Sequence, residues 1–137
     1  MSETLDAATR AFLDERRFAT LATIAEGGTP RLTVMWYLRR GDTIVCNTEA
    51  GRRRARNPCP DQWIVLRVED SYSSVSLNGT VQIDDDRAVA RVGIRELTAR
   101  YAESGTEAAF YDRNFRDYER ISYTLAVDRV RASSLLA

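Results

Sequence analysis

The sequence contains neither histidine nor lysine, so all 20 of its basic residues are arginine. Without histidine, the chain cannot itself form a Ser-His-Asp triad or a Cys-His pair, and it cannot offer histidine ligands to zinc or haem. Without lysine, it cannot form a Schiff base with a carbonyl substrate. We therefore predict no metal site and name no catalytic residue.

Cysteine is also scarce. Cys46 and Cys59 are the two thiols of the chain, too few for a disulfide scaffold or a closed zinc site. No apolar run approaches the roughly 20 residues that a membrane-spanning helix needs, and no signal-peptide pattern opens the sequence. These features predict free thiols and a cytoplasmic protein.

The 20 acidic residues balance the 20 arginines, so the formal net charge is zero. This balance argues against a protein that binds nucleic acid over its whole surface, and any electropositive site must be local. The 137 residues, 44% of them hydrophobic, predict one domain over residues 1–137. A chain of this length can bury about two-thirds of its extended surface.

Alternation of apolar and polar residues predicts six β-strands, joined mainly by short turns. The predicted strands are 18–24, 31–39, 43–48, 62–69, 74–83 and 121–130; the predicted helices are 3–16, a helix from Asp84 to about Glu103, and 107–117. The sequence has no glycine-rich phosphate loop of the common types. The pattern predicts a mainly β fold, a six-stranded antiparallel barrel with flanking helices.

The strand over 74–83 has the clearest alternation in the chain. Apolar positions occupy one face: Val75, Leu77, Gly79, Val81 and Ile83. Gly79 within this face predicts a bulge, a bend or a close approach of another backbone. Ser74, Ser76 and Asn78 lie on the opposite face, and the simplest interpretation is that they meet solvent.

The strand over 31–39 carries an aromatic pair. Trp36 shares a face with Val34, and Tyr37 shares the other face with Met35. The simplest interpretation places Trp36 in the core and Tyr37 on the surface. Alternatively, a flat and partly apolar ligand could lie on this strand.

Four arginines gather in the segment Thr48–Asn57, at Arg52, Arg53, Arg54 and Arg56. The segment follows a predicted strand, and we expect it to form a short helix or helical turn. Backbone N–H groups at a helix start, together with guanidinium groups, make a site for phosphate. The alternative is a solvated basic surface without a ligand.

Three motifs together resemble a known family. They are the run Gly28–Tyr37, the pair Asn47-Thr48 and the arginine run Gly51–Asn57. They are similar to those of the pyridoxamine 5'-phosphate oxidase-like split β-barrel flavin and deazaflavin oxidoreductases, and most similar to the branch that uses coenzyme F420. The resemblance extends from Phe12 to about Val130 and implies a homodimer with the cofactor at the subunit interface.

The resemblance also implies site residues. Val34, Met35, Trp36 and Tyr37 would form the strand beneath the cofactor ring, and Asn47 and Thr48 would face the ribityl chain and ring edge. Arg52, Arg53 and Arg54 would grip the phosphate, while Asn57 would fix the turn. Tyr72 and the aromatic residues within 107–117 are candidates for the contribution of the partner subunit.

The resemblance implies hydride transfer between coenzyme F420 and a small unsaturated acceptor, with chemistry that the cofactor supplies. FMN, whose phosphate the same arginines would grip, is the alternative cofactor. A non-catalytic protein of the same fold that only binds or carries a cofactor is a further alternative. RNA binding through the arginine segment is disfavoured because the net charge is zero.

Overall fold

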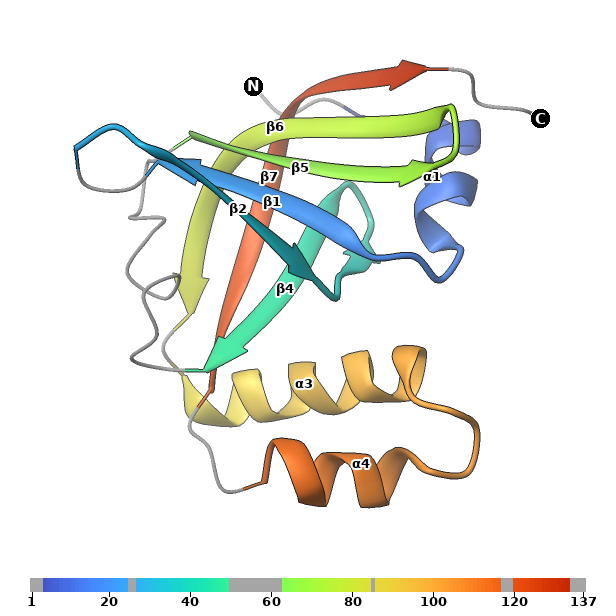
Figure 1. Cartoon of the computed structure of the whole chain (residues 1–137), viewed down its shortest axis with the longest axis vertical. Coiled ribbons are helices and arrows are strands. Elements are labelled where there is room, and N and C mark those ends of the chain that lie inside the picture. Colours follow the sequence, from blue (N-terminus) through green and yellow to red (C-terminus); the bar gives the residue numbers. More distant parts are fainter. Residues whose placement is uncertain (1–3, 25–26, 50–62, 85, 117–119, 134–137) are drawn as a thin grey trace.

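The computed structural model describes residues 4–24, 27–49, 63–84, 86–116 and 120–133. It is mainly β, with one curled antiparallel sheet and flanking helices (Figure 1). The strands are β1 (Ala19–Ile24), β2 (Pro30–Met35), β3 (Leu38–Arg40), β4 (Thr43–Glu49), β5 (Trp63–Asp70), β6 (Ser73–Asp84) and β7 (Arg120–Ser133), and the helices are α1 (Ala7–Asp14), α3 (Arg87–Tyr101) and α4 (Glu107–Asn114). The strand order is β2-β1-β5-β6-β7-β4-β3. This arrangement confirms the predicted split-barrel class.

The described part of the chain has seven strands, not six. The prediction of one strand over 31–39 is wrong, because the strand is interrupted at Trp36 and Tyr37. The first part, β2, pairs with β1, and the second part, β3, pairs with β4 at the other end of the sheet order. A short segment thus links the two ends of the sheet, and the sheet curls into a half-barrel. Alternation does not reveal this break, because it reports which face a residue occupies and not which strand it pairs with.

The concave side of the sheet holds the main hydrophobic core, and α1 packs against β3 and β6. Asp6 caps α1 by accepting a hydrogen bond from the Thr9 backbone N–H at 2.8 Å. At the other end of the helix, the Arg100 guanidinium donates to the carbonyl oxygens of Leu13 and Glu15. An arginine of α3 therefore binds carbonyl oxygens at the end of α1, where the helix itself supplies no further N–H donors.

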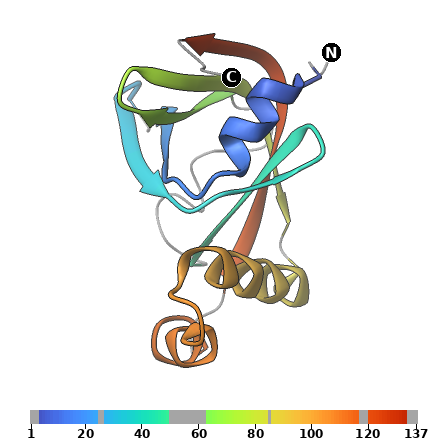
Figure 2. The same ribbon diagram turned by 90° about the vertical axis from the view of Figure 1, so that its right-hand side faces the viewer.

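Helices α3 and α4 form a second layer below one end of the sheet (Figure 2). Asp86, close to the predicted helix start at Asp84, caps α3 by accepting a hydrogen bond from the Ala88 N–H at 2.9 Å. The inner face of α3 is buried at Ala90, Ile94 and Leu97. Among the described residues, no helix is long and apolar enough to cross a membrane.

A bulge shapes the pair β6–β7. Asn78 lies opposite Arg129, but Gly79 lies opposite Val127, so Asp128 has no residue directly opposite it. A Cβ atom on Gly79 would lie 1.9 Å from the carbonyl oxygen of Ala126, a distance that no side chain tolerates. The prediction of a bulge or close approach at Gly79 is confirmed.

Candidate functional site

Trp36, just after β2, lies in a cluster of aromatic rings. Its indole is stacked on the Tyr101 ring, with centroids 5.0 Å apart and planes at 4°. Phe110 and Phe115 lie 5.7 and 5.8 Å from it. Tyr101 in turn stacks on Phe18 at 5.5 Å. Trp36 is therefore half-buried against α3 and α4, outside the main core.

Tyr37 points the opposite way. Its side chain is fully buried (0% exposed), and its hydroxyl donates to the carbonyl oxygen of Leu13 at 2.7 Å. Burial raises the pKa of Tyr37 well above its ordinary value. The interpretation with Trp36 in the core and Tyr37 on the surface is therefore wrong. Because the ring and hydroxyl of Tyr37 are engaged in the core, a ligand could meet Tyr37 only at its backbone. There the N–H donates to the Tyr101 hydroxyl and the carbonyl oxygen accepts from it, each at 3.3 Å.

β2 presents an apolar outer face. Leu32 and Val34 are 74% and 67% exposed, while Met35 is buried on the inner face. β2 is the terminal strand of the sheet and, within the described residues, pairs only with β1. A terminal strand has backbone N–H and C=O groups along its outer edge. The strand therefore combines a flat apolar surface with backbone groups that a ligand could meet.

Asn47 and Thr48 lie near the end of β4, and both side chains are buried. The Asn47 side-chain amide donates to the carbonyl oxygen of Ala90 at 2.8 Å and accepts from Arg120 Nε at 2.6 Å. Asn47 thus joins β4 to α3 and β7. In the described structure its side chain orients the strand from which the arginine segment departs.

Of the remaining predicted site residues, Tyr72 alone lies within the described part of the chain. Arg52, Arg53, Arg54 and Asn57 fall within residues 50–62, outside the described residues. Tyr72 is 90% exposed at the turn between β5 and β6. That turn precedes β6, whereas the far end of β6, at Asp84, lies beside Ser122, the residue opposite Asn47.

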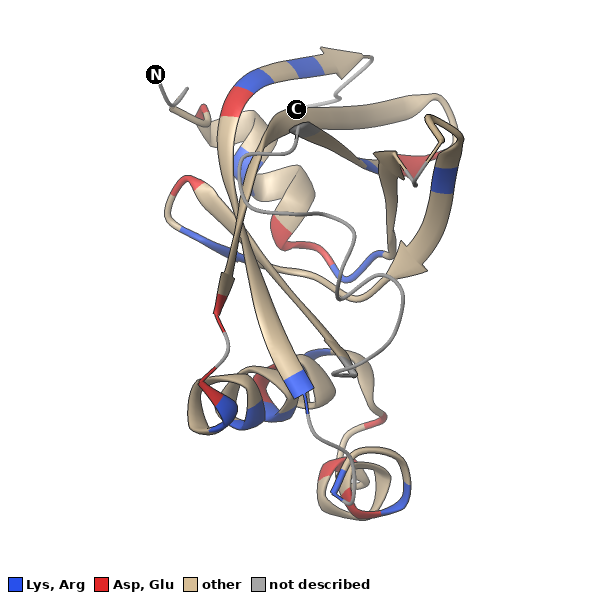
Figure 3. Ribbon diagram, turned by 90° about the vertical axis from the view of Figure 1, so that its left-hand side faces the viewer, with Lys and Arg blue, Asp and Glu red and all other residues tan. Residues whose placement is uncertain are grey.

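The structure also shows residues that the sequence did not single out. Tyr101 stacks on Trp36. Phe110 and Phe115, which the resemblance offered as contributions to a partner subunit, pack on Trp36 of their own chain. A second group lines a hollow on the outer face of β5, β6 and β7, where basic residues gather on the last part of β7 (Figure 3). The sequence does show the residues of this hollow, as serine and asparagine at alternate positions of 74–83 and as arginines at 129 and 131. It does not show which residues lie opposite one another on neighbouring strands, so the hollow could not be predicted.

Comparisons with known proteins agree with the geometry. A sequence model of the pyridoxamine 5'-phosphate oxidase family matches residues 5–132. A conserved hypothetical protein from Mycobacterium tuberculosis has a similar structure, with a TM-score of 0.76, 23% identity and 96% and 86% of the two chains covered. For a structure described as an F420 reductase, the TM-score is 0.71 at 20% identity, covering 93% of this chain and 98% of that one.

A flavocytochrome from Azotobacter vinelandii is a third similar structure, with a TM-score of 0.70 and 16% identity over 99% of this chain and 70% of the other. At these identities the three structures support the fold alone. A sequence search of curated proteins gave no match.

Proposed function

Because the chain belongs to the pyridoxamine 5'-phosphate oxidase family, we propose that it is an oxidoreductase that binds a flavin-type cofactor along β2. The observation that carries the proposal is the outer face of β2, where Leu32 and Val34 are exposed at the terminal strand of the sheet. An apolar surface with backbone groups along its edge suits a flat heterocycle that carries both apolar and hydrogen-bonding atoms.

The residues fit such a cofactor in a further respect. The chain has no histidine and no lysine, so it cannot use those side chains for acid–base or covalent catalysis. A mechanism in which a cofactor supplies the chemistry needs neither of them. When bound, a flavin or deazaflavin supplies hydride-transfer chemistry, and the protein need supply only position and electrostatics.

Several residues would hold the cofactor. Val34, Met35, Trp36 and Tyr37 would form the surface beneath the ring, with Met35 and Tyr37 acting through their backbone because their side chains face inward. Asn47 and Thr48, near the end of β4, would orient the start of the arginine segment that follows this strand. Arg52, Arg53 and Arg54 would bind the phosphate, and Asn57 would fix the turn.

We further propose that the protein is a homodimer with one cofactor at each subunit interface. Exposed apolar residues on β1, on β2 and just before β1 support this. Phe18, Ile24, Leu32 and Val34 are large apolar side chains that lie exposed on these neighbouring strands, and exposed apolar surface commonly marks an interface. Tyr72, which is 90% exposed at the turn between β5 and β6, would contribute to the site of the partner subunit.

Coenzyme F420 is the leading cofactor, with a small unsaturated molecule as hydride acceptor, and FMN is the alternative. Titration of the purified protein with each cofactor, followed by absorbance and fluorescence, separates the two. We expect affinity in the micromolar range or tighter for F420 and weaker binding of FMN. Tighter binding of FMN would replace F420 by FMN in the proposal.

Turnover separates an enzyme from a carrier. With reduced F420, and in parallel with reduced FMN, we expect oxidation of the cofactor by at least one member of a panel of enones, quinones and tetrapyrroles. Tight cofactor binding without turnover across the panel would favour a non-catalytic protein of the same fold.

A further inference from the structure

The outer face of β5, β6 and β7 carries two rows of side chains in register. In one row, Arg67 of β5 lies opposite Ser76 of β6, which lies opposite Arg131 of β7. In the other row, Val65 lies opposite Asn78, which lies opposite Arg129. Residues directly opposite each other in an antiparallel sheet project from the same face. The two rows therefore form one continuous surface.

The bulge at Asp128 determines which way Arg129 and Arg131 of β7 point. Val127 is fully buried on the inner face and lies opposite Gly79. Without the extra residue at Asp128, simple alternation would turn the residue at position 129 inward, because it is two positions after Val127. With the bulge, Arg129 and Arg131 are exposed and lie opposite Asn78 and Ser76.

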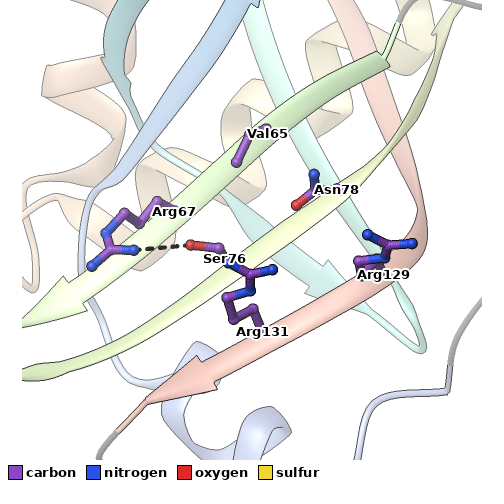
Figure 4. A pocket seen from close by; sticks show the side chains of 6 residues that line it. All are labelled: Val65, Arg67, Ser76, Asn78, Arg129 and Arg131. Carbon is purple, nitrogen blue, oxygen red and sulfur yellow. Dashed lines mark hydrogen bonds between the residues drawn. The ribbon is translucent and has the colours of Figure 1, made fainter.

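These side chains line a hollow of about 250 Å³ (Figure 4). Its lining is Val65, Arg67, Ser76, Asn78, Arg129 and Arg131. Arg67 Nη1 donates to the Ser76 hydroxyl at 3.1 Å, which holds this guanidinium against the wall of the hollow. The hollow therefore combines three guanidinium groups with a hydroxyl and an amide.

The positive charge of the hollow is poorly compensated. The carboxylate nearest to Arg67 is that of Glu69, at 3.8 Å between Nε and Oε1, and both side chains are about half exposed. A pair of this kind contributes little. Among the described residues, Arg129 and Arg131 form no ion pair with an acidic side chain. Arg67 on β5 and Arg129 and Arg131 on β7 lie on either side of β6. Their like charges repel one another, and an anion between them would offset that repulsion.

We propose that this hollow is a binding site for the oxyanionic group, phosphate or carboxylate, of a small ligand. Guanidinium groups of β5 and β7 bind the oxygen atoms from two sides, and Ser76 and Asn78 supply neutral donors on β6 between them. The site is two strands away from β2 in the sheet order. It does not depend on which cofactor lies along β2.

Calorimetric titration at low ionic strength tests the site with two probes, inorganic pyrophosphate and the tripeptide Glu-Glu-Glu. We expect at least one probe to bind with a dissociation constant of about 1 mM or tighter. The double variant R129Q/R131Q should weaken that binding at least about tenfold, the scale of one or two charge-assisted contacts. The probe that binds more tightly identifies the group as a phosphate or a carboxylate.

The matched control is R91Q/R113Q, which removes two exposed arginines from α3 and α4. This variant should bind the probes like the unchanged protein. Binding of neither probe would overturn the proposal, and so would equal weakening by both double variants, which would indicate net charge alone. A change in the monomer–dimer equilibrium of R129Q/R131Q with unaltered probe binding would instead assign this face to contact between copies.

Discussion

Tyr37 and Arg100 donate hydrogen bonds to the same acceptor, the carbonyl oxygen of Leu13, at 2.7 and 3.0 Å. The first comes from the segment that links the two ends of the sheet, the second from α3, and the acceptor is at the end of α1. One carbonyl thus joins three parts of the fold. These two hydrogen bonds hold the segment between β2 and β3 against α1 and α3.

Tyr37→Phe should destabilise the protein by about 1 kcal/mol, because it removes a buried hydroxyl donor while Arg100 continues to serve Leu13. Urea denaturation measures the change. Tyr72→Phe is the matched control. Tyr72 is 90% exposed, so loss of its hydroxyl should leave the unfolding free energy unchanged. Equal effects of the two variants would show that the Tyr37 hydroxyl carries no structural role.

Gly79→Ala should destabilise the protein by at least about 2 kcal/mol, because the new Cβ would lie 1.9 Å from the Ala126 carbonyl oxygen and would force β6 and β7 apart. Ser76→Ala, three residues away on the outer face of the same strand, is the control and should change stability much less. Thermal unfolding followed by circular dichroism distinguishes the two. A Gly79→Ala protein as stable as the unchanged chain would contradict the close approach.

Asp42→Asn should alter the dependence of stability on acid. The Asp42 carboxylate accepts hydrogen bonds from the Leu5 backbone N–H and from Arg10, and these lower the pKa of Asp42 below its ordinary value of 3.8. A lowered folded-state pKa gives a stabilising contribution that is complete above about pH 5 and is lost as the pH falls through 3.8 and then through the folded value.

The difference in unfolding free energy between the unchanged protein and Asp42→Asn should therefore be largest near pH 6 and should shrink below pH 3.8. Urea denaturation at a series of pH values measures it. Asp112→Asn, at an exposed position of α4, is the control and should show a small difference at every pH. A difference for Asp42→Asn that does not vary with pH would rule out the carboxylate as its source.

Arg54→Ala should weaken binding of the phosphate-bearing cofactor by about 1–3 kcal/mol, the scale of one charge-assisted contact. Cofactor titration measures the loss. Arg91→Ala, at an exposed position of α3, should have no comparable effect. If both variants weaken binding equally, the arginine segment is a solvated basic surface, and the phosphate must bind elsewhere.

The sequence alone predicted the elements whose signals are local. The alternation of 74–83 and 121–130 predicted the buried apolar faces of β6 and β7, although Ser74, expected to meet solvent, is buried. Asp86 caps α3 close to the predicted start of that helix at Asp84. Change of strand partner is not a local signal. The strand is interrupted at Trp36 and Tyr37 because β2, before the break, pairs with β1, whereas β3, after it, pairs with β4. Alternation does not report which strand is the partner.

The same limit applied to the candidate site. The packing of Trp36 on α3 and the burial of Tyr37 against α1 depend on where the two helices lie, so the sequence misplaced these two aromatic residues. The hollow on β5, β6 and β7 could not be predicted, because the bulge in β7 at Asp128 determines which face Arg129 and Arg131 occupy.

The sheet order also determines when each strand can find its partner during synthesis. β2, β1, β5 and β6 are neighbours in the sheet and can pair before β7 is made. β4 pairs with the first half of β7, from Arg120 to Ala126, and therefore remains with one unpaired edge until that strand inserts between it and β6. Such a long-range closure slows folding and leaves the β3–β4 hairpin open to pairing with other chains. We therefore expect a newly made chain to become much less prone to aggregation once β7 has paired with both β4 and β6.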